Sequence, residues 1–177
     1  MHFAAIKPHD VANGPGVRVS LFVSGCHHAC PGCFNPEAWS FAYGESFGEP
    51  QVRQILSALA PDYIRGLSLL GGEPLHPLNR AAVLKLVRQV RKHHPRKDIW
   101  CYTGYDFERE LLPESTADPI LRQLLEQIDV LVDGRFVEAK KNLNIRFRGS
   151  ENQRVLNLRA SLVAERGVPA EGDDQAY

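Results

Sequence analysis

Apolar residues recur along the chain with two different periods. Over residues 17–23 every second residue is Val or Leu, which predicts a strand that runs directly into a cysteine-rich loop. Over residues 52–59 apolar residues fall at i, i+3, i+4 and i+7, which predicts a helix. Further helices are predicted at 83–90 and 121–128, and further strands at 66–70, 99–103, 130–132 and 144–148. Residues 155–166 fit either a strand edge or a helix.

Strands that alternate with helices predict an α/β fold with a mostly parallel sheet, because parallel neighbours need a crossover and a helix usually provides it. Ligands of such sheets bind at the carboxyl ends of the strands. The unusual residues of this chain follow the predicted strands, at Gly25-Cys26 and at residues 71–74, 103–105 and 133–134. A closed eight-unit barrel takes about 250 residues. A chain of 177 residues therefore predicts an incomplete barrel, whose open side favours a macromolecular substrate.

Charge and composition narrow the classes of partner. The 21 Lys and Arg residues balance 21 Asp and Glu residues, which argues against a dedicated binder of nucleic acid or of an anionic membrane. The first residues hold no apolar run long enough for a signal peptide or a membrane span, so we expect a cytoplasmic protein. We expect one domain over residues 1–169 and a mobile acidic tail at residues 170–177.

Three of the four cysteines lie close together, because Cys26, Cys30 and Cys33 form the pattern C-x3-C-x2-C. In a reducing cytosol such a group binds metal or does redox chemistry rather than forming disulfides. A four-iron cluster held by protein alone needs four thiolates. Three thiolates would leave one iron open to a non-protein ligand. An open coordination position is typical of catalytic rather than structural metal sites.

A structural zinc site is the alternative interpretation of this loop, with His27, His28 or a distant residue as the fourth ligand. No second pair of metal ligands with zinc-site spacing follows in the sequence. We interpret both histidines as exposed loop residues. The fourth cysteine, Cys101, lies in an apolar strand, where a buried thiol packs as a small hydrophobe.

Further segments accompany the cysteine loop in an order and spacing typical of a known family. They are residues 13–16, 21–26, 30–33, 71–77, 98–100, 103–105, 132–134, 148–150 and 152–153. With these segments the chain resembles the radical S-adenosylmethionine enzymes, and within them the activating enzymes of anaerobic ribonucleoside-triphosphate reductases. The resemblance covers roughly residues 5–166. In the larger superfamily an aromatic residue often precedes the third cysteine. Here that position is Gly32 and the aromatic follows as Phe34, which resembles the activating-enzyme subgroup.

The resemblance implies a fold, two cofactors and a reaction. The fold would be an incomplete, open β/α barrel of the radical S-adenosylmethionine type. Cys26, Cys30 and Cys33 would ligate one [4Fe-4S] cluster, and S-adenosylmethionine would chelate the open iron. Reductive cleavage would give a 5′-deoxyadenosyl radical, which takes a hydrogen atom from a glycine of the reductase large subunit and leaves a glycyl radical. The cofactor pair carries the difficult chemistry, and the protein orients it.

The resemblance also implies contacts to S-adenosylmethionine from two segments. Gly71 and Gly72 would let backbone carbonyls approach its ammonium group, and Glu73 would add negative charge nearby. A plain turn after a strand is the alternative for this segment. Cys33 would contact the cofactor as well as ligate the cluster. Its neighbours Gly32 and Phe34 would contact the adenine through backbone groups and a ring face.

Three further residues resemble family positions but have looser assignments. Thr103 and Asp133 end strands, so both could line the cofactor site. Asp133 could instead cap a turn with Gly134. Arg148 could meet a carboxylate of the cofactor or the partner, or be a surface cation.

Reduced flavodoxin or ferredoxin is the electron donor that we expect. Residues 80–97 contain seven basic residues and no acid. A solvated helix face explains this run, and a docking patch for an acidic donor around Arg88 and Arg91 is the sharper interpretation. A small-molecule enzyme such as a 7-carboxy-7-deazaguanine synthase has a similar cysteine loop and is the alternative function. An electron carrier and a zinc-stabilised binding module are the non-enzymatic alternatives.

Overall fold

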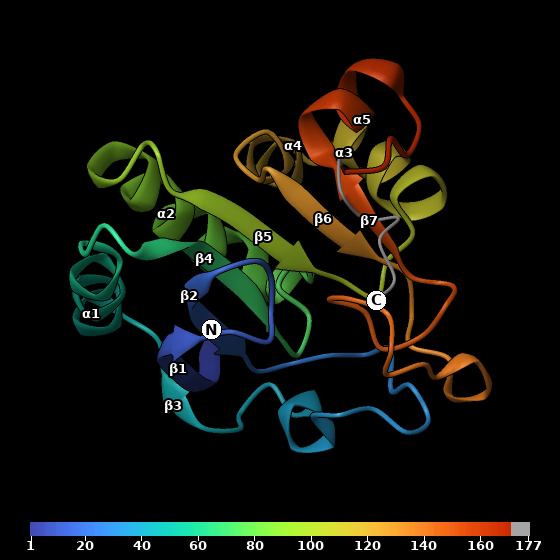
Figure 1. The fold of residues 1–177 in the computed structure, drawn as a ribbon, viewed down its shortest axis with the longest axis horizontal. Coiled ribbons are helices and arrows are strands. Elements are labelled where there is room, and N and C mark those ends of the chain that lie inside the picture. The colour runs from blue at the N-terminus through green and yellow to red at the C-terminus, as the bar shows by residue number, and fades with distance from the viewer. Residues whose placement is uncertain (171–177) are drawn as a thin grey trace.

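The strands form one open sheet whose order is β3-β1-β2-β4-β5-β6-β7 (Figure 1). The structure is a computed structural model that describes residues 1–170. The strands are β1 (His2–Asp10), β2 (Val17–Val23), β3 (Glu45–Ser46), β4 (Ile64–Gly71), β5 (Asp98–Tyr102), β6 (Val130–Asp133) and β7 (Arg154–Asn157). The helices are α1 (Glu49–Leu59), α2 (Pro77–His93), α3 (Leu112–Ala117), α4 (Pro119–Leu125) and α5 (Leu158–Ala164), with shorter turns η1 (Pro36–Trp39), η2 (Phe107–Leu111) and η3 (Glu138–Lys140).

The four central strands run parallel, since β2 pairs with β4, β4 with β5 and β5 with β6. At the two edges β1, β3 and β7 pair antiparallel with their neighbours. The predicted α/β fold with an open, mostly parallel sheet is confirmed, and the antiparallel edge strands are an addition. Val23 lies beside Gly71, and Tyr102 lies beside Val132. The loops that follow these parallel strands therefore meet at one edge of the sheet.

The hydrophobic core lies between one face of the sheet and the helices. Leu21, Leu69 and Cys101 are fully buried on this face, together with helix residues such as Ile55 and Val87. Their alternation along the strands is the period of two that the sequence predicted. Burying side chains of this size contributes about 1.5–3 kcal/mol each. The prediction that Cys101 is a packed, buried thiol is confirmed.

The alternate strand residues point to the opposite face. Phe22, Leu70 and Tyr102 are strand residues that line a cavity of about 610 Å³. The same face carries the buried Arg18, whose Nε donates to Ser68 Oγ at 2.7 Å. The two faces thus have different compositions, one apolar and covered by helices, the other partly polar and open to the cavity.

Residues 144–148 do not form the predicted strand. They lie in turns, and Phe147 has a φ of +57°, a left-handed conformation that interrupts an extended backbone. Residues 155–166 hold both elements that the sequence left open, because β7 ends at Asn157 and α5 begins at Leu158.

The last described residue, Ala170, lies beside the edge strand β7. Ala170 N–H donates to Val155 O at 2.9 Å. The predicted tail at residues 170–177 otherwise lies outside the described residues. Among residues 1–170, no helix has both the length and the apolar character that a membrane span requires.

Candidate metal and cofactor site

The cysteine loop begins where β2 ends, and backbone hydrogen bonds hold its entry. Gly25 N–H donates to Ala38 O at 2.8 Å, and Cys26 N–H donates to Trp39 O at 3.0 Å. Gly25 has a φ of +96°, and a Cβ there would lie 2.0 Å from the ring of Phe41. Only glycine fits such a position. The turn η1 and the end of β2 therefore fix the point at which the first thiol leaves the sheet.

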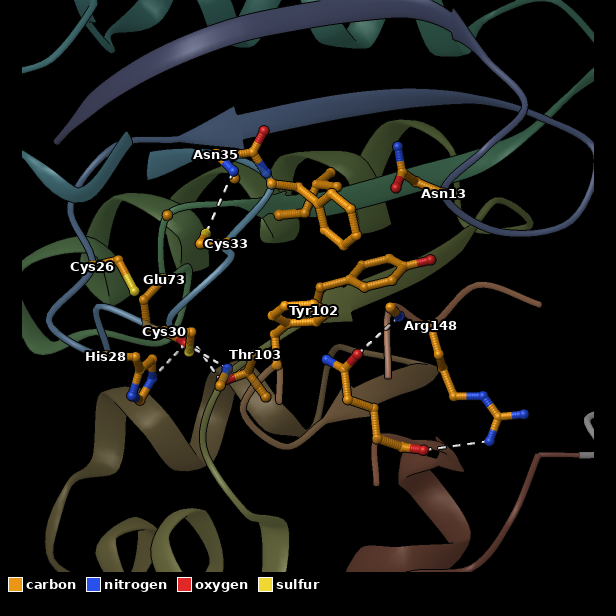
Figure 2. Close-up of a pocket in the computed structure, with 18 of the residues that line it drawn as sticks. Asn13, Cys26, His28, Cys30, Cys33, Asn35, Glu73, Tyr102, Thr103 and Arg148 are labelled. Carbon is orange, nitrogen blue, oxygen red and sulfur yellow. Dashed lines mark hydrogen bonds and ion pairs between the residues drawn. The ribbon is translucent and has the colours of Figure 1, made fainter. Parts of the chain in front are cut away.

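The three thiols of the loop line one cavity (Figure 2). Cys33 N–H donates to Cys30 O at 3.1 Å, which closes a turn, and Asn35 N–H donates to Cys33 Sγ at 3.4 Å. Burial raises the pKa of Cys26 to about 11 and also raises the pKa of Cys30. Because thiolates rather than thiols are metal ligands, a metal that binds here displaces protons.

The Glu73 carboxylate is buried and accepts four hydrogen bonds. Oε1 accepts from Thr103 Oγ1 at 2.8 Å and from Leu75 N–H at 3.0 Å. Oε2 accepts from Gly104 N–H at 2.8 Å and pairs with His28 Nε2 at 3.0 Å. These donors satisfy the buried carboxylate. The same bonds tie the end of β4 to the loop after β5 and to the cysteine loop.

His28 is not exposed, so this sequence prediction is wrong. Its side chain is 2% exposed. The ring lies over Gly104, where a Cβ would be 2.4 Å from Cδ2 of the imidazole, and its centroid is 4.7 Å from that of Tyr105. The neighbouring His27 is exposed, as predicted. The partner of His28 is Glu73, which lies 45 positions further along the chain, so no local pattern distinguishes the two histidines.

The two glycines after β4 allow two stretches of backbone to approach each other. Gly72 N–H donates to Val23 O at 2.7 Å, and a Cβ on Gly72 would lie 2.7 Å from Gly25 O. Gly71 has a φ of +104°, and a Cβ there would lie 2.7 Å from Val23 O. A side chain at either position would push the cysteine loop away from β4.

The cavity gathers all but two of the residues that the sequence and the resemblance assigned to cluster or cofactor. Those that line it are Cys26, Cys30, Cys33, Phe34, Gly71, Gly72, Glu73 and Thr103. Gly32 does not line it, because a Cβ on Gly32 would meet the carboxyl group of Glu138 at 2.9 Å on another side of the loop. Arg148 lines the cavity, and its Nη1 donates to Gln153 O at 3.3 Å.

Asp133 does not line the cavity either. Its Oδ2 accepts from Phe107 N–H at 2.9 Å, and its Oδ1 accepts from Arg154 Nε at 2.9 Å. The alternative that Asp133 contacts the cofactor is therefore not supported. This carboxylate instead holds η2 and β7 to the end of β6.

Sequence reasoning did not single out Tyr102 and Asn79. The Tyr102 ring lines the cavity, and burial raises the pKa of its hydroxyl group. The period of two along β5 was the available signal, since it places Tyr102 opposite the core residue Cys101. Asn79, at the start of α2, donates through Nδ2 to Ser24 O and to Glu73 O, each at 3.0 Å. Asn79 thereby donates hydrogen bonds both to the segment that enters the cysteine loop and to the loop after β4.

Comparison with known sequences gives consistent relatives. A family described as a 4Fe-4S single cluster domain matches residues 12–156. The anaerobic ribonucleoside-triphosphate reductase-activating protein of Pasteurella multocida is 46% identical over 155 residues, which are 86% of this chain and 95% of that protein. The proteins of the same name from Escherichia coli K12 and phage T4 are 44% identical over 161 residues and 42% identical over 157. These matches cover 90% and 88% of this chain, and 100% and 93% of the relatives.

The chain belongs to this family of activating proteins. The residues of this family member fit an iron–sulfur cluster with one open iron. Three thiols line the cavity, whereas Cys101 is fully buried on the face that the helices cover. Of the two histidines considered as zinc ligands, His28 is bonded to Glu73 and His27 is exposed. A cavity of about 610 Å³ lies within the usual size range of small-molecule sites, which leaves room for an organic ligand beside the thiols.

The basic run at residues 80–97 of this family member is largely engaged within the fold. The side chain of Arg80 is buried and pairs with Asp118 at 2.5 Å. Arg91 pairs with Asp129 at 2.7 Å. Arg88 is exposed. Several cations of α2 thus pair with acidic residues of the same chain. Docking of an electron donor around Arg88 and Arg91 stays a prediction.

Proposed function

We propose that the protein is a radical activase. It cleaves S-adenosylmethionine reductively and generates a glycyl radical on an anaerobic ribonucleoside-triphosphate reductase. The observation that carries this proposal is the single cavity shared by three thiols, the Gly71-Gly72 backbone and Thr103. The names of the relatives support the reductase as partner. The proposal includes one domain over residues 1–169, an open β/α barrel of the radical S-adenosylmethionine type and a cytoplasmic site of action.

Cys26, Cys30 and Cys33 would hold a [4Fe-4S] cluster by its three thiolate-bound irons. When bound, cluster and cofactor would supply the chemistry, which is one-electron cleavage of the sulfonium to methionine and a 5′-deoxyadenosyl radical able to take a hydrogen atom from the glycine Cα of the reductase. The backbone N–H of Asn35 donates to Cys33 Sγ. Hydrogen bonds to cluster sulfur tune the potential of such sites. The chain thus contributes the ligands and part of their electrostatic surroundings.

Gly71, Gly72 and Glu73 would bind the ammonium end of S-adenosylmethionine. The absence of side chains on the two glycines brings backbone carbonyl groups within reach of this cation. Because the Glu73 carboxylate already accepts four hydrogen bonds from the protein, it would contribute charge and hold the segment in place. Phe34 and Thr103 line the same cavity and would contact other parts of the cofactor, while Gly32 would act only through its neighbours.

The electron would come from reduced flavodoxin or ferredoxin. A small acidic redox protein could use the exposed cations of the basic run, of which Arg88 is one. Charge reversal at Arg88 would then slow cluster reduction and weaken its dependence on salt. An unchanged rate and salt dependence would exclude docking at this helix.

Formation of 5′-deoxyadenosine tests the proposed reaction. Anaerobically reconstituted protein, given S-adenosylmethionine and a strong one-electron reductant, should form this product, and Cys30→Ala should not. Cys101→Ala is the matched control, since this thiol lies in the core outside the cavity, and it should keep the activity. With purified reductase added, a glycyl radical should be detected by electron paramagnetic resonance. A protein that carries a four-iron cluster but forms no 5′-deoxyadenosine would contradict the proposal.

The alternative function, an enzyme acting on a small purine-like molecule, has no support among the relatives. It would form product with its small substrate alone and would need no protein partner. The relatives reported above are named as activating proteins, which favours the activase. Glycyl radical formation that depends on the reductase would decide between the two.

A further inference from the structure

Two large apolar side chains that line the cavity are also exposed to solvent. Phe34 and Leu143 both line the cavity, yet their exposed fractions are 56% and 75%. Val11 and Val137 are also exposed, and each is next in sequence to a residue that lines the cavity. We call these four residues the apolar lip. Single exposed apolar residues are ordinary on a protein surface, but a group of them around one opening marks an interaction site.

The segment that carries half of this lip is strongly cationic. Residues 135–148 contain five Lys and Arg residues and one acid, although the whole chain has no net charge. Lys140 and Lys141 are exposed, and Lys141 Nζ lies 5.3 Å from the centroid of the Phe34 ring. A partner that covers the apolar lip therefore also meets positive charge.

We propose that the apolar lip, with Lys140 and Lys141, is the docking surface for an acidic segment of the reductase that carries a large apolar side chain. This rests on the proposed function, because it is the reductase that must bring a glycine into the cavity. A polypeptide that enters past Phe34 and Leu143 covers both side chains. The lysines beside them would steer an acidic partner and exclude a basic one.

The affinity for purified reductase tests this surface directly. Anaerobic titration of the cluster-loaded protein with the reductase gives a Kd for wild type, Leu143→Asp and the double variant Lys140→Glu/Lys141→Glu. An acidic residue in the centre of an apolar contact should weaken binding about tenfold or more, as truncation of a hot-spot residue does. For the double variant, the difference from wild type should shrink as the salt concentration rises, because exposed charges are screened.

Two variants on distant surfaces are matched controls. Val163, in α5, is 84% exposed, and Lys92, in α2, is exposed as well. Neither lines the cavity. Val163→Asp adds the same charge as Leu143→Asp, and Lys92→Glu reverses one lysine as the lip variant reverses two. Both controls should bind the reductase with a Kd within about twofold of wild type, as surface substitutions usually do.

The possible outcomes separate the docking surface from the proposed function. Weaker binding by both lip variants, with unchanged controls, supports the surface. Wild-type affinity in Leu143→Asp and in the lysine variant overturns the surface but leaves the activase proposal standing. If the apolar lip instead mediates pairing of two copies of this chain, the lip variants would change the sedimentation of the free protein but not the Kd for the reductase. That result would also overturn the docking surface. A wild-type protein that does not bind the reductase overturns both proposals.

Discussion

Two neighbouring histidines in the cysteine loop have opposite surroundings. His28 is buried and bonded to Glu73, whereas His27 is exposed. We expect His28→Leu to leave the buried carboxylate one donor short and to lower the free energy of unfolding by about 1–3 kcal/mol. His27→Leu should change it by no more than about 0.5 kcal/mol. Anaerobic urea unfolding of the two variants measures this difference.

His28→Gln separates the hydrogen bond from the bulk of the ring. A glutamine amide can donate to Glu73 from nearly the same position, so this variant should recover part of the loss. If the bond positions the loop, His28→Leu should shift the midpoint potential of the reconstituted cluster and His28→Gln should restore it. If His28→Leu were as stable as His27→Leu, the pair would have no structural role.

Gly104 and His28 should be energetically coupled. A Cβ on Gly104 would lie 2.4 Å from Cδ2 and 2.7 Å from Nε2 of His28. Gly104→Ala should therefore destabilise the wild-type protein by about 1–3 kcal/mol through overpacking. In a His28→Ala background the clash is gone and the same substitution should be nearly neutral. A double-mutant cycle of unfolding free energies measures the coupling, and additive effects would mean that the ring does not lie on Gly104.

At the scale of elements, Arg154 joins three segments that the sequence separates. It is the first residue of β7, and it pairs with Asp133 at the end of β6 and with Glu108 in η2, where Nη2 to Oε2 is 2.6 Å. Glu108 Oε1 also accepts from Gly167 N–H at 2.6 Å. Three carboxylates gather around this arginine, namely Asp106, Glu108 and Asp133, and the guanidinium accounts for their proximity.

The Glu108 contact predicts a pH dependence of stability. The hydrogen bond from Arg154 lowers the pKa of Glu108 from 4.5 to about 2. Because its pKa is lower in the folded than in the unfolded protein, ionised Glu108 stabilises the fold at pH values above the unfolded pKa. This contribution is lost as the pH falls from about 4.5 to about 2. Because both side chains are partly exposed, Glu108→Gln should cost only about 1 kcal/mol at pH 7.

Urea unfolding of wild type and Glu108→Gln, prepared identically at pH 7, 5 and 3, measures this dependence. The difference between the two proteins should be nearly the same at pH 7 and 5 and clearly smaller at pH 3, because Glu108 is partly protonated only as the pH approaches its folded pKa. A difference that stays constant down to pH 3 would show that Glu108 acts through its shape and not through its charge.

Local patterns predicted the elements whose apolar side chains recur regularly on the face that enters the core. The predicted strand at residues 17–23 is β2, because every second side chain of that stretch enters the core. The strand β1 was not predicted, since its sequence includes Pro8 and its extended form depends on pairing with β2. The pairing is irregular between Lys7 and Asp10, which accommodates the missing N–H of the proline.

The candidate site was predictable to the extent that its residues follow strands. Parallel strands bring the cysteine loop, Glu73 and Thr103 to one edge of the sheet, and the cavity contains all three. The burial of His28 and the outward position of Gly32 depend on contacts with distant residues, Glu73 and Glu138. A motif identifies which residues a site needs, but side-chain orientation comes from partners that only the folded chain supplies.

At the scale of the whole molecule, ligand binding should stabilise one edge of the sheet and leave the rest unchanged. The cavity is lined by loops that follow β2, β4 and β5, by residues 134–153 and by Lys7, Ala12 and Asn13, whereas the far end of α2 does not reach it. Local opening governs amide exchange, so exchange maps which segments a ligand holds. We expect S-adenosylmethionine, added to the cluster-loaded protein, to slow exchange in peptides that cover residues 26–35, 71–73 and 102–104.

Peptides that cover residues 85–97 serve as the internal control in the same hydrogen–deuterium exchange experiment. They belong to α2 and the turn behind it, at the opposite end of the helix from Glu73, and should exchange equally with and without the cofactor. Protection should grow with cofactor concentration, because a ligand that binds only the folded state stabilises it by mass action. Protection confined to α2, or none at residues 71–73, would mean that the cofactor binds elsewhere and that the glycines serve only to pack the cysteine loop against β4.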